Sequence, residues 1–219
     1  ALELCTKYKK SIGIISVVND KMIGREIEVL EYFMQFPCIK GVNFTPCYDF
    51  KIISRSDINT HGSITIQEYH DFLKNVFILW KTNIERYKFI IEPFFSIIRS
   101  LSGKTTTSCH YSKFKCANMF TIYPNGEIGS CDEINTRYKR FGNVFDFHLI
   151  DDLILKQKQH DLFRDAVEIN QKCSKCKKIN ICQEGCISSR LNFCNLSKED
   201  EYCMARCDLI DFVADNLTK

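Results

Sequence analysis

The sequence lacks an apolar run long enough to cross a membrane, and it has little excess charge of either sign. A spanning helix needs about 20 consecutive apolar residues, and no such run occurs in the 219 residues. The start also lacks the basic-then-apolar order of a secretion signal. Thirty lysines and arginines against 27 aspartates and glutamates leave a formal charge of +3, which favours neither nucleic acid nor a membrane as partner. We therefore expect a cytoplasmic protein.

Internal repeats and low-complexity tracts are also missing, and a composition of 45% apolar and 26% charged residues is typical of a globular chain. Cysteine, in contrast, is abundant. Ten of the 13 cysteines fall between Cys109 and Cys207. In a reducing compartment this density indicates bound metal rather than disulfides.

The first half alternates strand-like and helical patterns. Residues 11–18 form a continuous apolar run that predicts a strand buried on both faces. Residues 24–36 predict an amphipathic helix, and residues 41–45 predict the next strand. Such an order is typical of a parallel α/β unit.

Two longer helical patterns follow. Thr65 and Glu68 form a capping box that begins one helix, and a second helix is expected from about Pro93 to Leu101. After Gly103 the composition shifts towards cysteine, lysine and asparagine. We therefore expect two domains, residues 1–103 and 104–219.

Two parallel strands do not close a sheet, and an open parallel edge is a pairing hazard in water. Residue 1 is not a methionine, and the chain enters its first strand almost at once. We expect the chain to be the C-terminal part of a longer protein.

The cysteines of the second half follow a regular order. Cys109 comes first, and a Cys-x9-Gly-x4-Cys segment follows at Cys116–Cys131. A Cys-x2-Cys-x5-Cys-x3-Cys segment comes later, at Cys173–Cys186, and Cys203 follows it. A Cys-x2-Cys pair bends a loop so that two thiolates reach one metal centre. Sulfur sites of this kind hold zinc or iron–sulfur clusters. Asn125-Gly126 predicts a hairpin that folds Cys131 back towards Cys116.

This order resembles the SPASM domain, the C-terminal module of radical SAM enzymes that modify peptides and proteins. Phe44-Thr-Pro-Cys47 and Phe141-Gly-Asn-Val144 also look like the anaerobic sulfatase-maturating branch. The resemblance implies an α/β fragment, the last strands and helices of a partial (β/α)6 radical SAM barrel, followed by a small α+β SPASM domain with a β-hairpin. Residues 1 to 50 would hold the last barrel strands.

The resemblance also implies two auxiliary [4Fe-4S] clusters. The ligands would be Cys109, Cys116, Cys131 and Cys186 for the first cluster, and Cys173, Cys176, Cys182 and Cys203 for the second. Each cluster would tie distant segments together, so the metal-free chain would lose much of its stability. Cys207 lies four residues after Cys203 on the same expected helix face and is an alternative last ligand, and Cys194 is left over.

Other interpretations of these residues remain open. Ligand type alone also allows a pair of structural zinc sites. His110 could bond a cluster sulfide or simply be exposed. The three early cysteines are interpreted as small buried hydrophobes: Cys5, Cys38 and Cys47.

Asp132 directly follows Cys131. In sulfatase-maturating members an aspartate at this position is held to be the base that deprotonates the substrate residue, so the resemblance implies a catalytic role for Asp132. The alternative is an aspartate that caps the turn or pairs with Lys139 or Arg140.

Cys-x3-Cys-x2-Cys, the ligand set of a SAM-cleaving cluster, is missing. Cys182-x3-Cys186 and Cys203-x3-Cys207 lack the third cysteine at the required spacing. We therefore do not expect this chain to cleave SAM alone, and SAM with a third [4Fe-4S] cluster would occur only in a longer parent.

The resulting functional hypothesis is the C-terminal part of an enzyme that oxidises or cross-links a peptide residue. Its partners would be a peptide or protein substrate and an electron donor such as flavodoxin or ferredoxin. Two alternatives are a stand-alone, non-catalytic iron–sulfur module for electron transfer or peptide binding, and a zinc-stapled structural domain. Iron and sulfide content separates them.

Overall fold

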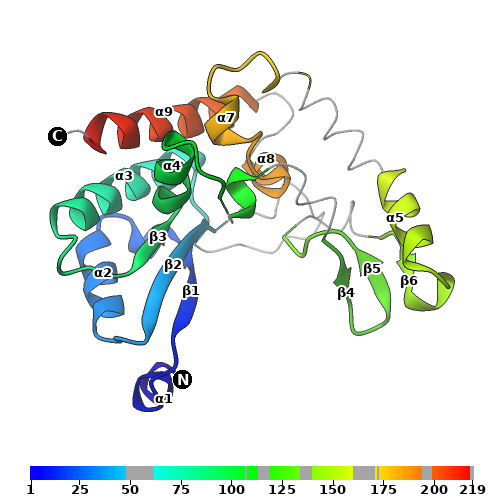
Figure 1. Cartoon of the computed structure of the whole chain (residues 1–219), viewed down its shortest axis with the longest axis horizontal. Coiled ribbons are helices and arrows are strands. Elements are labelled where there is room, and N and C mark those ends of the chain that lie inside the picture. Colours follow the sequence, from blue (N-terminus) through cyan, green and yellow to red (C-terminus); the bar gives the residue numbers. More distant parts are fainter. Residues whose placement is uncertain are drawn as a thin grey trace. The chain divides into compact units, whose positions relative to one another are not determined.

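A computed structural model describes residues 1–47, 62–106, 108–112, 119–133, 140–159, 171, 173–193 and 199–217. The chain divides into two compact units (Figure 1): residues 1–108 with 192–219, and residues 109–191. Across the described ranges, none of the helices combines the length and the apolar character that crossing a bilayer demands.

The first unit is built on a parallel sheet in the order β1-β2-β3, with strands β1 (Ile12–Val18), β2 (Ile39–Pro46) and β3 (Ile90–Glu92). Gly41 of β2 pairs with Gly13 of β1 on one side and with Ile90 of β3 on the other. The two strands predicted from the sequence are confirmed. The sequence pattern missed β3, because three residues carry too little periodicity to separate a strand from a loop.

Helices flank this sheet: α1 (Leu2–Lys7), the 3-10 turn η1 (Asp20–Met22), α2 (Glu26–Met34), α3 (Ile66–Thr82), α4 (Phe94–Leu101) and α9 (Glu199–Leu217). Three of the predicted helices correspond to α2, α3 and α4, and the helix expected around Cys203 and Cys207 corresponds to α9. The capping box of α3 is present, since the Glu68 amide donates to Thr65 Oγ1 at 3.2 Å and the Thr65 amide donates to Glu68 Oε2 at 2.7 Å. The cap thus satisfies two amides that have no partner inside the helix.

Large apolar side chains form the core of this unit. Phe44 of β2 meets Phe72 of α3 with ring centroids 5.3 Å apart, and Phe77 meets Phe94 of α4 at 5.1 Å. Helix α9 adds its own apolar face against α3 and α4. Side chains that are exposed by 2% or less include Leu30, Val42, Phe44, Phe72, Phe77, Ile91, Phe94, Ile97, Leu209, Ile210 and Val213.

Because α9 packs on α3 and α4, the end of the chain is part of the first unit. The sequence boundary near Gly103 groups these residues with the cysteine-rich half instead. Cysteine spacing carries no information on which helix α9 packs against. The apolar face of α9 identifies its partner only when the position of α3 is known. The compact units themselves divide after Ser108 and again before Asn192.

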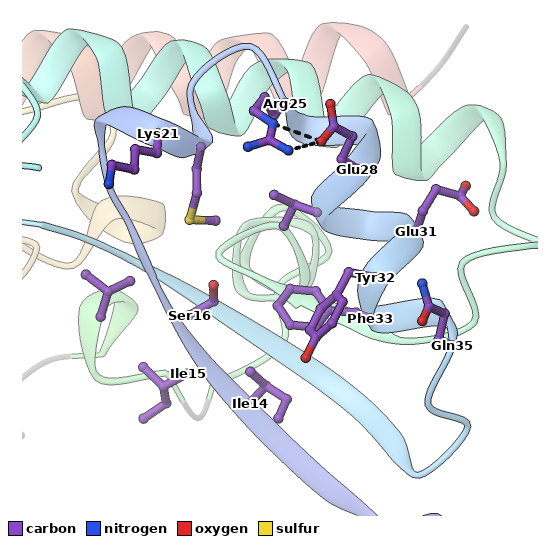
Figure 2. Close-up of a pocket in the computed structure, with 13 residues that line it drawn as sticks. Ile14, Ile15, Ser16, Lys21, Arg25, Glu28, Glu31, Tyr32, Phe33 and Gln35 are labelled. Atoms are coloured by element: carbon purple, nitrogen blue, oxygen red, sulfur yellow. Dashed lines mark hydrogen bonds and ion pairs between the residues drawn. The ribbon is translucent and has the colours of Figure 1, made fainter. Parts of the chain in front are cut away.

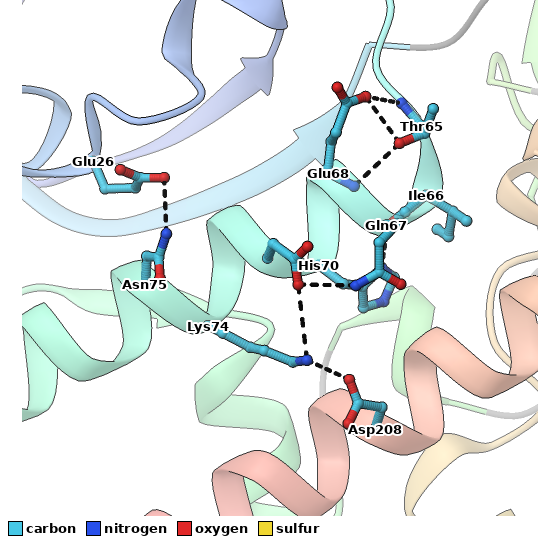
Figure 3. Close-up of polar contacts among 10 residues, drawn as sticks. Glu26, Thr65, Ile66, Gln67, Glu68, His70, Lys74, Asn75 and Asp208 are labelled. Atoms are coloured by element: carbon cyan, nitrogen blue, oxygen red, sulfur yellow. Dashed lines mark hydrogen bonds and ion pairs between the residues drawn. The ribbon is translucent and has the colours of Figure 1, made fainter.

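Polar groups also join α3 to α9 (Figure 3). Lys74 forms an ion pair with Asp208 of α9 and a longer one, 3.8 Å, with Asp71. His70 is only 3% exposed, and its Nδ1 lies 2.8 Å from the Ile66 carbonyl. Burial lowers the pKa of His70 to about 4, while the Ile66 carbonyl opposes this shift. His70 is therefore neutral at physiological pH and holds its ring against the helix backbone.

The outer face of β1 differs from the sequence prediction. A strand buried on both faces was expected, but Ile15 and Val17 are 73% and 52% exposed, so only alternate side chains are covered. β1 is the edge strand of the described sheet, and the apolar composition of a strand does not show whether a neighbour covers it. The prediction of two-sided burial is wrong for the chain as described.

A groove of about 820 Å³ lies between β1 and α2 (Figure 2). Ile14, Ile15 and Tyr32 contribute its apolar surface, and Arg25 donates to Glu28 at the rim through Nε at 2.8 Å. The first unit thus presents an apolar groove along its edge strand.

The second unit contains short elements: η3 (Cys109–Tyr111), β4 (Thr121–Ile122), β5 (Glu127–Gly129), β6 (Gly142–Asn143), η6 (Val144–Asp146), α5 (Ile150–Lys158), α7 (Ile179–Cys182) and α8 (Ile187–Phe193). β4, β5 and β6 form an antiparallel sheet. The predicted hairpin turn is confirmed, with Gly126 at a φ of +80°. A Cβ on this glycine would lie 2.9 Å from Asn143 Oδ1, so the turn needs glycine for space as well as for conformation.

The apolar cluster of this unit is small. Ile128, Phe141 and Leu153 are buried in it, and Phe120, Val144 and Phe147 pack against it half-covered. Within the described residues of this unit, an apolar cluster of this size supplies only part of the stability that a small unit needs to fold alone.

Candidate metal-binding site

Three predicted ligands lie together on one short segment of the second unit. The Cys176 amide donates to the Cys173 carbonyl at 2.9 Å, which closes a tight turn, and the Cys182 amide donates to the Lys178 carbonyl at 2.8 Å at the end of α7. Cys173 is buried, and Cys176 and Cys182 are half-buried. The Cys-x2-Cys spacing thus forms the turn that metal-binding pairs use.

The chain then reverses sharply before the next predicted ligand. Gln183, Glu184 and Gly185 have φ values of 50°, 68° and 73°. Two successive non-glycine residues in this left-handed region are uncommon and carry a conformational cost. The reversal leads into α8, with Cys186 buried directly before its first residue.

Cys186 meets donors from two other segments. The ligand atoms of His110, Glu133 and Cys186 all lie within 4.8 Å of one another. His110 belongs to η3 and Glu133 follows Cys131 by two residues. Ser188 of α8 donates to the Glu133 carbonyl, which holds the two segments together. Sulfur, nitrogen and oxygen donors in one place suit a transition metal.

The thiols at this place are poorly ionised without a cation. Burial raises the pKa of Cys131 to about 12, and the nearby negative groups of Asp132 and Glu133 add to the shift. Burial likewise raises the pKa of Cys186, although the hydroxyl and amide of Ser189 oppose it. A metal or cluster would supply the missing positive charge. The donors present therefore fit a metal group.

The structure brings some of the eight predicted ligands together. Cys131 and Cys186 lie close enough for their charges to interact, while Cys109 is exposed on η3. In the first unit, Cys203 lies on α9, and Cys207 follows it by one turn on the same helix. Cys116 and Cys194 lie outside the described residues. Ligation by all eight stays a prediction.

Asp132 lies beside one of these thiols. The Cys131 Sγ donates to Asp132 Oδ1 at 3.5 Å, and the aspartate is exposed. One alternative partner is engaged elsewhere, since Arg140 Nε pairs with Glu127 Oε1 at 3.4 Å; Lys139 lies outside the described residues. The carboxylate is thus next to a predicted ligand and open to solvent.

Sequence reasoning missed Glu133 and Arg190. Arg190 is 3% exposed, and its Nη2 donates to Cys173 Sγ at 3.5 Å and to the Glu184 carbonyl at 3.0 Å. A usable signal was present, because Arg190 follows Cys186 by four residues, one turn of a helix. The sequence pattern predicts no helix there, so the spacing alone does not indicate that Arg190 lies near the cysteines.

The early cysteines belong to the first unit. Cys38 is buried and its Sγ lies 3.6 Å from the Leu2 carbonyl, which confirms its interpretation as a small core residue. Cys5 and Cys47 are half-buried, and burial raises the pKa of Cys47. Burial therefore favours the neutral thiol of Cys47.

Comparison with known proteins identifies relatives of this chain. The chain is 26% identical over 219 residues to a cysteine-type anaerobic sulfatase-maturating enzyme of Clostridium perfringens (strain 13 / Type A). The alignment covers 97% of this chain and 56% of the relative. The chain is also 26% identical over 212 residues to the cysteine-type enzyme of Clostridium novyi (strain NT), covering 92% and 53%. No protein-family model matches the chain.

Two solved structures share the fold. Native anSMEcpe with bound AdoMet has a TM-score of 0.71 at 22% identity, covering 99% of this chain and 58% of that one. Native anSMEcpe with bound AdoMet and the Cp18Cys peptide has a TM-score of 0.70 at 21% identity, covering 99% and 59%. The chain thus spans between 53% and 59% of the length of these four relatives.

The homologues of this chain are proteins of the radical SAM family, and the likeness extends over nearly its whole length. More particularly, they are anaerobic sulfatase-maturating enzymes. The resemblance predicted from cysteine spacing is therefore confirmed.

Proposed function

We propose that this chain is the C-terminal part of a radical SAM/SPASM enzyme that oxidises a cysteine residue in a peptide or protein substrate. The observation that carries the proposal is the match of 97% of the chain to a cysteine-type sulfatase-maturating enzyme. The peptide bound in a homologous structure supports a peptide as substrate. An electron donor such as a flavodoxin or ferredoxin would supply the reducing equivalents.

The first unit would be the last strands of a partial barrel. Its sheet is parallel, and α2 and α3 connect the successive strands, as in a repeated β/α unit. The exposed apolar face of β1 and the groove beside α2 support this assignment, because parallel strands are normally covered on both faces. The remaining strands of a longer protein would pair with β1 and cover the groove.

The cysteine-rich unit would hold two auxiliary [4Fe-4S] clusters, with the two sets of four ligands named from the sequence. The turn that joins Cys173 to Cys176, and the buried thiols of Cys131 and Cys186, support this assignment. When bound, the clusters would accept an electron from the substrate. The protein's part is to hold the thiolates and to exclude water from them.

Asp132 would act as the base. Oxidation of a cysteine removes one hydrogen atom from Cβ, one proton from the thiol and one electron; water then replaces the sulfur, giving an aldehyde and hydrogen sulfide. The proton needs an acceptor within hydrogen-bond reach, and the exposed carboxylate of Asp132 is a suitable one. Its position beside Cys131 would place the departing proton and electron close together.

The test uses the complete gene product, purified anaerobically and supplied with SAM, a reductant and a cysteine-containing peptide. Mass spectrometry should show conversion of the cysteine to formylglycine. Asp132→Asn should lower turnover by a factor of about 10² to 10⁴, with iron content and SAM cleavage retained. Asp151→Asn, an exposed aspartate in the first turn of α5, serves as the matched control. Full turnover in Asp132→Asn would exclude the base assignment.

One observation favours a second candidate, a zinc-stapled structural domain. The mixed donors His110, Glu133 and Cys186 would also suit a single Zn²⁺ ion. Metal and sulfide analysis after anaerobic purification separates the two. Two four-iron clusters predict about eight irons per chain with inorganic sulfide, whereas zinc without sulfide would replace the first proposal by the second.

A further inference from the structure

Arg190 connects the two ends of the Cys173–Cys186 segment in the second unit. It lies in α8 one turn after Cys186, and its amide donates to the Cys186 carbonyl at 3.0 Å. Its side chain reaches Cys173, where Nη2 donates to Sγ at 3.5 Å. One residue therefore links a proposed ligand of the first cluster, through the backbone, to a proposed ligand of the second cluster, through its side chain.

The same guanidinium holds the reversal between these cysteines. Nη2 also donates to the Glu184 carbonyl at 3.0 Å, and Glu184 has the left-handed φ of 68°. Strained backbone of this kind persists only where the surroundings fix it. Arg190 thus fixes both the path of the chain and the position of the Cys173 sulfur.

The charge of Arg190 matters because it is buried. A guanidinium stays protonated in proteins, and at 3% exposure it has lost nearly all contact with water. A buried charge is costly unless it is paired and hydrogen-bonded. A thiolate at Cys173, and still more an anionic cluster on it, would supply a compensating negative charge.

A buried cation beside a ligating sulfur also acts on electron transfer. When an iron–sulfur cluster takes up one electron, its negative charge increases by one unit. Hydrogen bonds to the sulfurs and nearby positive charge both stabilise the reduced form and raise the reduction potential. Low solvent exposure strengthens the effect, because water does not screen the charge.

We propose that Arg190 is a positioning residue that binds the Cys173 sulfur and raises the reduction potential of the cluster held by Cys173, Cys176 and Cys182. The inference rests on the proposed function, since it requires that cluster to form. It assigns to one side chain the task of making this cluster the better electron acceptor. It also gives a reason for a buried arginine beside Cys173 and Cys186.

The experiment measures the potentials of both clusters by redox titration followed by electron paramagnetic resonance, together with iron and sulfide content. Arg190→Gln keeps a hydrogen-bond donor but removes the charge. The reduction potential of the cluster bound by Cys173 should therefore become more negative, while that of the other cluster should change less. Arg190→Lys keeps the charge and should stay closer to the unaltered protein. The control is Arg140→Gln, which removes the same charge from a side chain that is 75% exposed and should shift neither potential.

Unchanged potentials in an Arg190→Gln protein with full iron content would overturn the proposal. If Arg190→Gln holds less iron, Arg190→Lys decides: recovery of iron supports the charge role, and a deficit equal to that of the glutamine variant overturns it. Absence of clusters from the unaltered protein would instead refute the proposed function, and the role of Arg190 with it.

Discussion

The two units of this molecule differ in what holds them together. The first has a continuous core in which aromatic and aliphatic side chains from three strands and four helices are almost fully buried. Among its described residues, the second unit has an apolar cluster of three buried and three partly buried side chains, together with several cysteines. Apolar burial accounts for the first unit, whereas the proposed metal group would fix the segments of the second.

This contrast shows that one chain can use two kinds of folding information. In the first unit the identity of each core position matters less than its periodicity. In the second, the spacing of a few thiols and the shape of the turns between them matter most. The two units should therefore respond in opposite ways to metal removal and to core truncation.

Metal removal should give the largest effect. Binding energies of about 10 to 16 kcal/mol are known for structural zinc in small domains, so stripping the iron by oxidation and chelation should unfold the second unit. We expect amide hydrogen exchange to accelerate across residues 119–133 and 173–190, with β2 and α3 still protected. Equal protection in both units after iron loss would contradict the proposed difference.

Much of the first unit could be predicted from the sequence. Alternation and helical spacing gave β1, β2, α2, α3 and α4, because each has enough residues for a period to show. The short strand β3 could not be found this way. The cover of α9 over α3, and the bare face of β1, depend on contacts between distant segments, which a local pattern does not contain.

The candidate site was predictable only in part. Cysteine spacing identified the segments, and the homologues confirm the family that the spacing predicted. The same spacing gave no sign of Glu133 or Arg190, because acidic and basic residues are common near any loop. Their roles depend on burial and on the left-handed reversal at residues 183–185, which appear only in three dimensions.

Truncation of the first core should give the next largest effect. Phe77 is fully buried against Phe94 and Phe212, so Phe77→Ala should cost about 3 to 5 kcal/mol of unfolding free energy. Its neighbour Ile78 is 39% exposed, and Ile78→Ala should change stability by less than about 0.5 kcal/mol. Chemical denaturation followed by the Trp80 signal measures both. Iron content measured on the same variant tests whether α9, which carries both Phe212 and the proposed ligand Cys203, couples this core to the metal group.

Acid should weaken the first unit through His70. Its pKa is about 4 when folded and about 6.5 in the unfolded chain. Between these two pH values the unfolded chain binds a proton at His70 and the folded chain does not. The contribution of His70 to stability is therefore complete above pH 6.5 and falls as the pH drops towards 4. The loss should reach about 3 kcal/mol.

The groups that face His70 are Lys74 on its own helix and Arg206 and Asp208 on α9. Because carboxylates titrate in the same range, the informative quantity is the difference between the unaltered protein and His70→Gln. Denaturation midpoints measured from pH 7.5 to 4 should fall more steeply for the histidine protein. Parallel curves would mean that His70 does not carry the acid sensitivity.

The smallest expected effect concerns the start of α3. Thr65→Ala removes the hydroxyl that accepts from the Glu68 amide, and loss of such a cap costs about 1 kcal/mol. Thr65→Ser keeps the acceptor and should lose much less. Since α3 belongs to the unit held by apolar burial, the loss should be the same in iron-loaded and iron-depleted protein when α3 protection is followed by hydrogen exchange. A cap whose effect depended on iron would mean that the metal group also stabilises α3, and apolar burial alone would then not account for the first unit.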